Sequence, residues 1–380
     1  MVIRRTHAWM RGALAALGAV CPWVASAQAP DILSALDAGS RALGMGGATS
    51  ATDITPHAAL LNPAGLGYIS APTLTLSFRS LPDSASALTG SLADPRFSTT
   101  RRYGRTAFTH LGYAMPLKKG AIGLSYSIGG YLLEERAGSA LSLGSGQTAV
   151  GYSAFTKSQT DFFTLSYGEA QTSSSYGLGI VVANQSLDTR ESYDVYNGLA
   201  LGGTVSRQAK GISQGIGLVA GWQGSAGADG MVGASVRTPI SLKGSQEATD
   251  AYGRIPGRAS LGYAGRRSIK SGEGDYFTYG LQLDYHFGGE KSGSFARKDA
   301  LGFGLGLEYS FVRTGSRFPI RLGYQSLEAM GQGLSDRSGF SYGIGWRPDS
   351  SRLGLDLNFF KDRSGGASDA SLGITYRLSQ

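Results

Sequence analysis

The feature that most constrains this fold is an alternation of bulky apolar residues with small or polar ones. Between 276 and 287 the bulky set is Phe277, Tyr279, Leu281, Leu283, Tyr285 and Phe287. Segments 301–311 and 371–378 repeat the pattern. Because successive side chains of a β-strand point to opposite faces, this period of two predicts a sheet with one apolar face. No part of 72–380 has a convincing helical period.

The predicted strands suit a membrane better than a soluble sandwich. They run to ~10–14 residues, whereas globular strands average ~5–6 and membrane-spanning strands need ~9–11. Their apolar face is often aromatic near its ends, as an interfacial girdle requires. Only a closed barrel satisfies every backbone group of a sheet in lipid. The sequence therefore predicts an all-β, transmembrane, antiparallel barrel over 72–380.

Fourteen strands are predicted, and an even number is usual in bacterial barrels. The connections after the even-numbered strands are short, whereas those around 81–104 and 134–158 are the longest. Outer-membrane barrels have short periplasmic turns and longer extracellular loops, so both termini are predicted to be periplasmic. The predicted strands are 72–80, 105–115, 119–133, 159–169, 175–189, 212–222, 229–240, 258–267, 275–288, 300–313, 317–327, 338–347, 350–361 and 369–379.

Glycine is unusually abundant, with 58 of the 380 residues, while charged residues make up only 16%. The glycines have no collagen-like period, the single cysteine excludes a disulfide scaffold, and the apolar content argues against disorder. Many glycines fall on the inward-facing register, which predicts a smooth inner wall around something that occupies the lumen. These positions are Gly112, Gly123, Gly129, Gly280, Gly302, Gly304, Gly306, Gly323, Gly343, Gly345, Gly354 and Gly373.

Residues 1–27 have the three regions of a signal peptide in the right order: a basic start, an apolar stretch and Ala25-Ser26-Ala27. Cleavage is expected after Ala27, and the alternative is a buried N-terminal helix. Cleavage would remove Cys21, so that the mature chain would have no thiol for a disulfide, a metal site or catalysis. It would also remove three arginines and lower the net charge from +8 to +5. The remaining basic residues are scattered, which is not typical of nucleic-acid binding.

Residues 28–71 lack the period of two and contain two helix-like stretches, 31–37 and 56–61, the second with Asp53 or Thr55 as a candidate cap. A barrel of fourteen strands is too wide for its own side chains to fill. We therefore expect 28–71 to form a plug, or hatch, inside the barrel. The alternative is a periplasmic tail.

Within this segment, Ser40-Arg41-Ala42-Leu43-Gly44-Met45-Gly46-Gly47-Ala48, Asp53 and Asn62-Pro63-Ala64-Gly65-Leu66 resemble the N-terminal signature of the FadL superfamily. That superfamily includes FadL-type transporters of long-chain fatty acids and hydrocarbons, and the PorV-like proteins of secretion. The motif Gly44-Met45-Gly46-Gly47-Ala48 resembles the PorV-like branch more than true FadL. The resemblance implies a 14-stranded barrel, a hatch containing the Asn-Pro-Ala turn and, in FadL-type members, a kinked third strand that lets ligand leave sideways.

Two sets of residues follow as candidates. The hatch motif consists of Arg41, Gly44, Gly46, Gly47 and Asp53, and the ligand or gating residues are Asn62, Pro63, Ala64, Gly65, Gly129 and Gly130. Gly129-Gly130 would supply the kink, and the alternative is a regular strand with a plain inward-facing glycine.

No sequence motif points to catalysis, and no catalytic residue, metal ligand or cofactor is predicted. The Gly44-Met45-Gly46-Gly47 stretch lacks the strand and the Gly-Lys-Ser/Thr ending of a phosphate loop. The histidines at 57, 110 and 286 have no metal-ligand spacing. Inward-facing charges are expected to pair with one another or with the plug: Arg79, Asp284, Glu308, Arg321, Arg347, Asp356 and Arg377.

The preferred function is therefore passive uptake of a hydrophobic small molecule, such as a fatty acid or hydrocarbon, across the outer membrane of a Gram-negative type cell. Ligand would bind near the long connections 81–104 and 134–158, and movement of the hatch would open the path. The alternative is a non-enzymatic, PorV-like component that handles secreted proteins or envelope assembly, and a diffusion pore comes third. Outer-membrane lipid or lipopolysaccharide is an expected partner in each case.

Overall fold

The computed structural model describes residues 39–93, 95–245, 253–269, 274–289, 297–313, 315–331, 336–349, 352–363 and 368–378. The predicted signal peptide and the helix-like stretch 31–37 lie outside these ranges. Within them, fourteen antiparallel strands close into a barrel in chain order, because β1 pairs with β17 and β5 pairs with β6. The predicted fold class and number of wall strands are confirmed.

The wall strands are β1 Thr73–Gly90, β2 Pro95–Pro116, β3 Ala121–Gly144, β4 Gln147–Ala170, β5 Ser174–Asn197, β6 Ala200–Ser225, β7 Gly230–Arg237, β11 Gly257–Ser268, β12 Tyr276–Phe287, β13 Ala300–Arg313, β14 Ser316–Leu327, β15 Arg337–Pro348, β16 Leu353–Asp362 and β17 Ser368–Arg377. Three short strands lie between β7 and β11: β8 Ile240–Ser241, β9 Lys243–Gly244 and β10 Arg254–Ile255. Pro239 has no N–H for a sheet ladder, which fits the end of β7 at Arg237.

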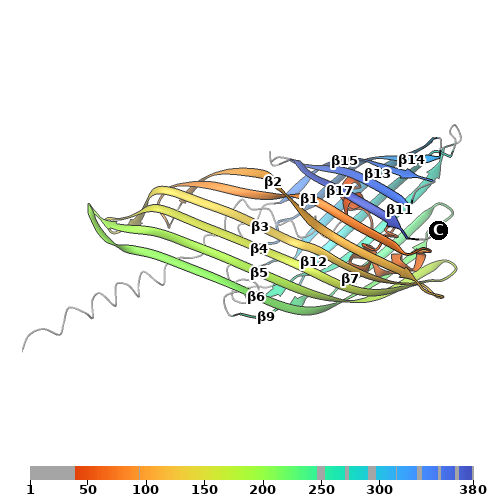
Figure 1. Ribbon diagram of the computed structural model, residues 1–380, viewed down its shortest axis with the longest axis horizontal. Helices are drawn as coiled ribbons and strands as arrows, with labels where there is room; N and C mark the ends of the chain where they lie inside the picture. Colours follow the sequence, from red (N-terminus) through yellow and green to blue (C-terminus); the bar gives the residue numbers. More distant parts are fainter. Residues whose placement is uncertain are drawn as a thin grey trace, which may run out of the picture.

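The wall is much taller on one side than on the other (Figure 1). Strands β1–β6 have 18 to 26 residues, whereas β7 and β11–β17 have 8 to 14. The predicted long connections 81–104 and 134–158 are therefore wrong, since most of their residues continue strands. Residues 145–146 alone connect β3 to β4, and 198–199 connect β5 to β6. The sequence hid these extensions because polar residues predominate in them, which weakens the alternation, although they share a buried apolar cluster of Leu88, Leu141, Ala149, Tyr152 and Tyr193.

A band of exposed apolar side chains marks the part of the wall that lipid covers. On β5 the outward residues Tyr176, Leu178, Ile180 and Val182 are 38–70% exposed. The next outward position is polar on β4, β5 and β6. Its residues are Asp161, Asn184 and Gln214, which lie side by side in the sheet. Seven residues of strand span ~23 Å, close to the apolar band of ~25 Å in known barrels. The tall side of the wall therefore continues beyond the membrane.

The N-terminal segment, residues 39–71, is mostly irregular. It contains α3 Ser40–Gly44, α4 Ala58–Leu61 and the 3-10 helix η1 Pro63–Tyr68. The helix predicted at 56–61 is present, but His57 precedes it and no side chain caps it. Asp53 instead accepts hydrogen bonds from the backbone N–H and hydroxyl of Thr55. No helix in the described ranges is long and apolar enough to span a bilayer.

Candidate functional site

The N-terminal segment lies against the inward faces of strands on opposite sides of the barrel. Helix α3 contacts β14–β17, whereas η1 contacts β3–β6. Inward glycines make room for it: a Cβ added at Gly373 would lie 2.6 Å from Ser40 Cβ, and one at Gly123 would lie 2.8 Å from Leu66 Cδ2. The predicted positions that meet the segment are Gly112, Gly123, Gly280, Gly304, Gly306, Gly323 and Gly373. The remaining predicted positions face side chains of the wall: Gly129, Gly302, Gly343, Gly345 and Gly354.

Arg41 connects this segment to a buried chain of alternating charges. Its guanidinium lies 3.2 Å from Glu308, whose carboxylate also lies 2.7 Å from Arg321. Arg321 is 1% exposed and reaches Asp356 at 2.7 Å, and Asp356 pairs with Arg347. Each buried charge thus has a partner of opposite sign, which offsets the cost of removing it from water. The predicted pairing of inward charges, including one contact to the N-terminal segment, is confirmed here.

Two further inward charges also have partners. Arg79 pairs with Asp369, which in turn pairs with Arg337 at 2.7 Å. Asp284 pairs with Arg258 at 3.1 Å. Arg377 keeps the predicted register of Ser371 and Gly373, but its side chain is exposed because it lies at the end of β17, at the rim of the barrel.

The glycines of the hatch motif allow close approach to the wall. Gly46 and Gly47 adopt positive φ angles of 61° and 82°, which side chains disfavour. A Cβ at Gly46 would also meet the backbones of Leu305 and Tyr324. A Cβ at Gly44 would collide with the side chain of Asn358. The motif therefore fits a segment that turns tightly against β13, β14 and β16.

The Asn-Pro-Ala turn attaches the other end of the segment. Asn62 is fully buried, and its Nδ2 donates to the carbonyl oxygens of Ser50 at 2.7 Å and Trp222 at 3.2 Å. Its Oδ1 accepts from the N–H of Ala64 and so caps η1, which begins at Pro63. Gly65 packs on the backbone of Asp53. One side chain thus holds both the turn and its contact with β6.

Asp53 contacts Gly65 of the Asn-Pro-Ala turn, and it also lies beside a buried pair of imidazole rings. Its carboxylate lies 3.4 Å from Nδ1 of His57, and the ring of His57 meets the ring of His110 edge-on at 4.4 Å. Burial raises the pKa of Asp53, but the hydrogen bonds from His57 and Thr55 outweigh it and leave that pKa below its ordinary value. The two rings therefore bridge the segment and β2.

The wall is irregular where β3 passes Gly129. The β2–β3 pairing ends at His110 and Ser127, and the β3–β4 register then skips Gly129, which is the sign of a β-bulge. Further along, β3 pairs in parallel with β1 at 133–137. The β1–β2 hairpin therefore crosses over, so that β2 lies beside β3 below the bulge and β1 above it. The β2–β3 register thus ends at Ser127, and the β1–β3 register begins at Leu133.

Apolar side chains seal this break in the wall. Leu81 of β1 packs with Ile128 and Tyr131 of β3, and all three are at most 5% exposed. The hydroxyl of Tyr131 donates to Asp83 at 2.9 Å, so a hydrogen bond also joins β3 to β1. Sequence reasoning missed Leu81 and Asp83 because both lie in the part of β1 that it assigned to a connection. An apolar Leu beside a predicted strand end was the available signal.

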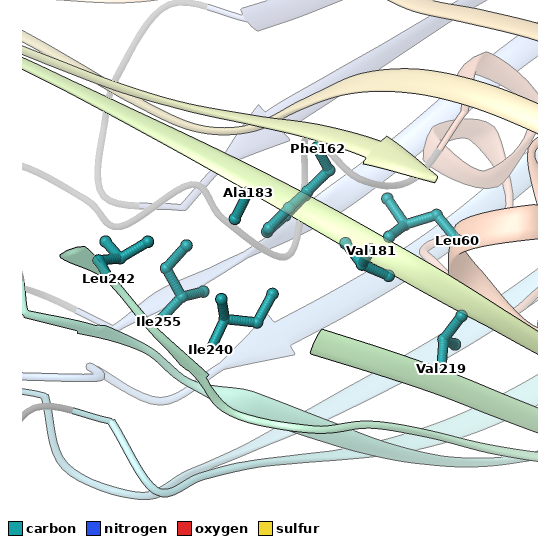
Figure 2. Packing of buried hydrophobic residues seen from close by; sticks show 8 residues of the cluster. All are labelled: Leu60, Phe162, Val181, Ala183, Val219, Ile240, Leu242 and Ile255. Carbon is teal, nitrogen blue, oxygen red and sulfur yellow. The ribbon is translucent and has the colours of Figure 1, made fainter. Parts of the chain in front are cut away.

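Behind the break lies an apolar cluster inside the barrel (Figure 2). Phe162 packs its ring against Gly129, in the space that a side chain there would need. Leu60 brings the N-terminal segment into the same cluster, and Ile240 brings the connection after β7. The full set, each member at most 6% exposed, is Leu60, Phe162, Val181, Ala183, Val219, Ile240, Leu242 and Ile255. Apolar surface thus extends from the segment to the bulge.

The buried charged side chains named above form ion pairs in the part of the chain that the structure describes. No group of three or more His, Cys, Asp or Glu residues is placed to hold a metal there. The contacts that are present hold the segment, seal the break and form the apolar cluster.

No protein-family model and no curated protein sequence matches the chain. Its fold is nevertheless similar to that of several solved structures. A Pseudomonas aeruginosa FadL homologue matches with a TM-score of 0.59 at 15% identity, over 90% of this chain and 98% of that one. The Ralstonia pickettii toluene transporter TbuX matches at 0.57 and 13% identity, over 90% and 98%. The P. putida toluene transporter TodX matches at 0.56 and 10% identity, over 90% and 99%.

Proposed function

We propose that the chain is an outer-membrane channel for passive uptake of hydrophobic small molecules, of the hydrocarbon or fatty-acid type. The observation that carries the proposal is the break between β2 and β3, with an apolar cluster directly behind it. Structures with the same fold are described as toluene transporters and as a monoaromatic hydrocarbon channel. A ligand that dissolves in the bilayer gains from leaving through the wall, because it never has to enter the periplasmic water.

The proposed route has three parts. Ligand enters from the tall side of the barrel, replaces contacts within the cluster around Phe162, and leaves past Gly129-Gly130 into the membrane. Residues 28–71 act as the plug that blocks the straight path to the other end. The Asn62–Gly65 turn is its gating element, because Asn62 bonds both the segment and β6.

A reversible tether across the crossover tests this route. Ala87 of β1 and Ala137 of β3 are paired and exposed, so Ala87→Cys with Ala137→Cys would form a disulfide across the two strands. Oxidation should abolish uptake of labelled toluene by proteoliposomes, and reduction should restore it. The matched control joins two strands of the regular wall, with Leu261→Cys and Leu283→Cys, and should transport in both states. Unimpaired uptake through the oxidised Ala87–Ala137 tether would contradict the lateral route.

We further propose that both termini face the periplasm, so that the tall strands project outward from the cell. The turns at the end of the barrel where β1 begins are short, including 117–120 and 171–173. An epitope inserted at 198–199 should be labelled on intact cells, and one inserted at 171–173 only after permeabilisation. The reverse labelling would contradict this orientation.

The protruding sheet gives the alternative function its one supporting observation. Nearly all side chains of β6 from 200 to 210 are exposed, on both faces of the strand. A partner such as a secreted protein would find room there, as expected for a PorV-like component. Deletion of the gene decides between the two: loss of hydrocarbon uptake with normal secretion supports the channel, and the opposite result supports the alternative.

A further inference from the structure

An apolar groove crosses the lipid-facing side of the wall, away from the proposed route. It has a volume of about 600 Å³ and follows two outward rows of side chains on β4–β7. Tyr167, Leu178, Ala220 and Val236 form one row, since each is paired with the next. Leu165, Ile180 and Leu218 form the second, and Thr238 continues it. The groove therefore lies across the strands, not along a single one.

Small residues give the groove its depth. Ala220 stands between larger neighbours in its row, and the backbone of Gly179 forms part of the floor between Leu178 and Ile180. The side chain of Val219 points inward into the apolar cluster, so only its backbone contributes to the outer surface. With Ile122 of β3 at one end, the rows cross five strands, a length of ~19 Å at the usual strand spacing. These dimensions suit one extended acyl chain.

Charged groups lie where this groove meets the short turns. The hydroxyl of Tyr167, which lines the groove, lies 2.5 Å from the carbonyl oxygen of Lys119 and 3.0 Å from the carboxylate of Glu169, so it can donate to either. Lys118 and Lys119 form the exposed tip of the β2–β3 turn. Two basic residues and one acidic residue thus lie at the turn end of the groove. A phosphate with a neighbouring ammonium group complements this set of charges.

We propose that the groove is a binding site for a phospholipid of the phosphatidylethanolamine type. One acyl chain lies along Tyr167, Leu178 and Ala220, and the headgroup phosphate is held by Lys118 and Lys119. The headgroup ammonium lies at Glu169. This site is separate from the transport route, which opens at β2–β3 and is lined from inside the barrel.

Lipid retention by the full-length protein provides the test. Native mass spectrometry in detergent should show one phosphatidylethanolamine retained, and no comparable retention of a diacylglycerol that lacks the headgroup. Ala220→Trp should abolish retention, and Leu322→Trp, at an outward position of β14, should not. Lys118→Gln and Lys119→Gln should each weaken retention about fivefold, since a basic residue near a lipid surface contributes on that scale. Arg267→Gln, an exposed charge at the same end of the barrel, should have no effect.

Several results would overturn the proposal. One is equal retention by Ala220→Trp and Leu322→Trp, and another is equal retention of the lipid and the diacylglycerol. Preferential retention of lipopolysaccharide would assign the groove to the other leaflet and equally refute it. If Ala220→Trp fails to fold, as judged by its heat-dependent mobility in gels, the two lysine variants decide, because they lie in an exposed turn. Toluene uptake should remain unchanged in all of them, which keeps this test independent of the proposed channel function.

Discussion

The hydrogen bond between Tyr131 and Asp83 offers the sharpest test of the seal. It joins β3 to β1 across the break, at 2.9 Å between the hydroxyl and the carboxylate. Tyr131→Phe removes this bond and leaves the ring to pack with Leu81 and Ile128. A hydrogen bond to a charged group stabilises by ~1.5–3 kcal/mol, and we use the lower value because Asp83 is partly exposed.

That loss shifts the balance between sealed and open states by roughly tenfold. If opening of the break limits uptake, the initial rate of toluene uptake at subsaturating concentration should rise by a comparable factor. The matched control is Tyr126→Phe, which removes a 3.0 Å bond to Asp161 between β3 and β4, where the wall is continuous. The reasoning fails if Tyr131→Phe leaves uptake unchanged, or if Tyr126→Phe raises it to the same extent.

Three further predictions concern how the segment is held. Arg321→Met removes the partner that Glu308 and Asp356 share, and should lower the heat resistance of the barrel in gel-shift assays, because each buried acid then keeps only one arginine. Gly323→Val places a Cβ 2.8 Å from the carbonyl carbon of Met45, and should displace α3 and raise single-channel conductance in planar bilayers. The pKa of Asp53 is below its ordinary value of 3.8. Its contacts with His57 and Thr55 therefore stabilise the folded state fully above pH 3.8, and this stabilisation is lost as the pH falls through the lowered pKa. Conductance of the wild type should therefore rise only in acid, whereas Asp53→Asn should conduct at pH 7.

Much of the wall follows from the sequence because lipid imposes a simple rule on it. Every strand in the bilayer must place apolar residues outward, so β12 and β13 are visible as a period of two in Phe277–Phe287 and Leu301–Phe311. The inward register likewise showed small and charged positions, and the pairing of Glu308 with Arg321 could be expected because isolated buried charges are costly.

Outside the membrane this rule no longer applies, and the alternation that identifies a strand in the sequence weakens. Polar residues predominate in the upper parts of β3–β6, apart from a buried apolar cluster that includes Leu141, Tyr152 and Tyr193, so their alternation is weak although their backbone ladders continue. Residues 81–104 and 134–158 therefore looked like loops. Only hydrogen bonding between neighbouring strands, which depends on the whole wall, shows that they are sheet.

The sequence by itself determined the class of barrel, its strand number and the inward positions of most charges and glycines, because these depend on local alternation. The tertiary structure alone decided what the glycines face, since Gly373 meets Ser40 whereas Gly129 meets Phe162. The position of the break in the wall also follows only from the tertiary structure, because it lies where the strand that pairs with β3 changes from β2 to β1. Which strands pair depends on contacts between residues far apart in the chain, such as Leu81 and Tyr131, and no local sequence pattern predicts such a contact.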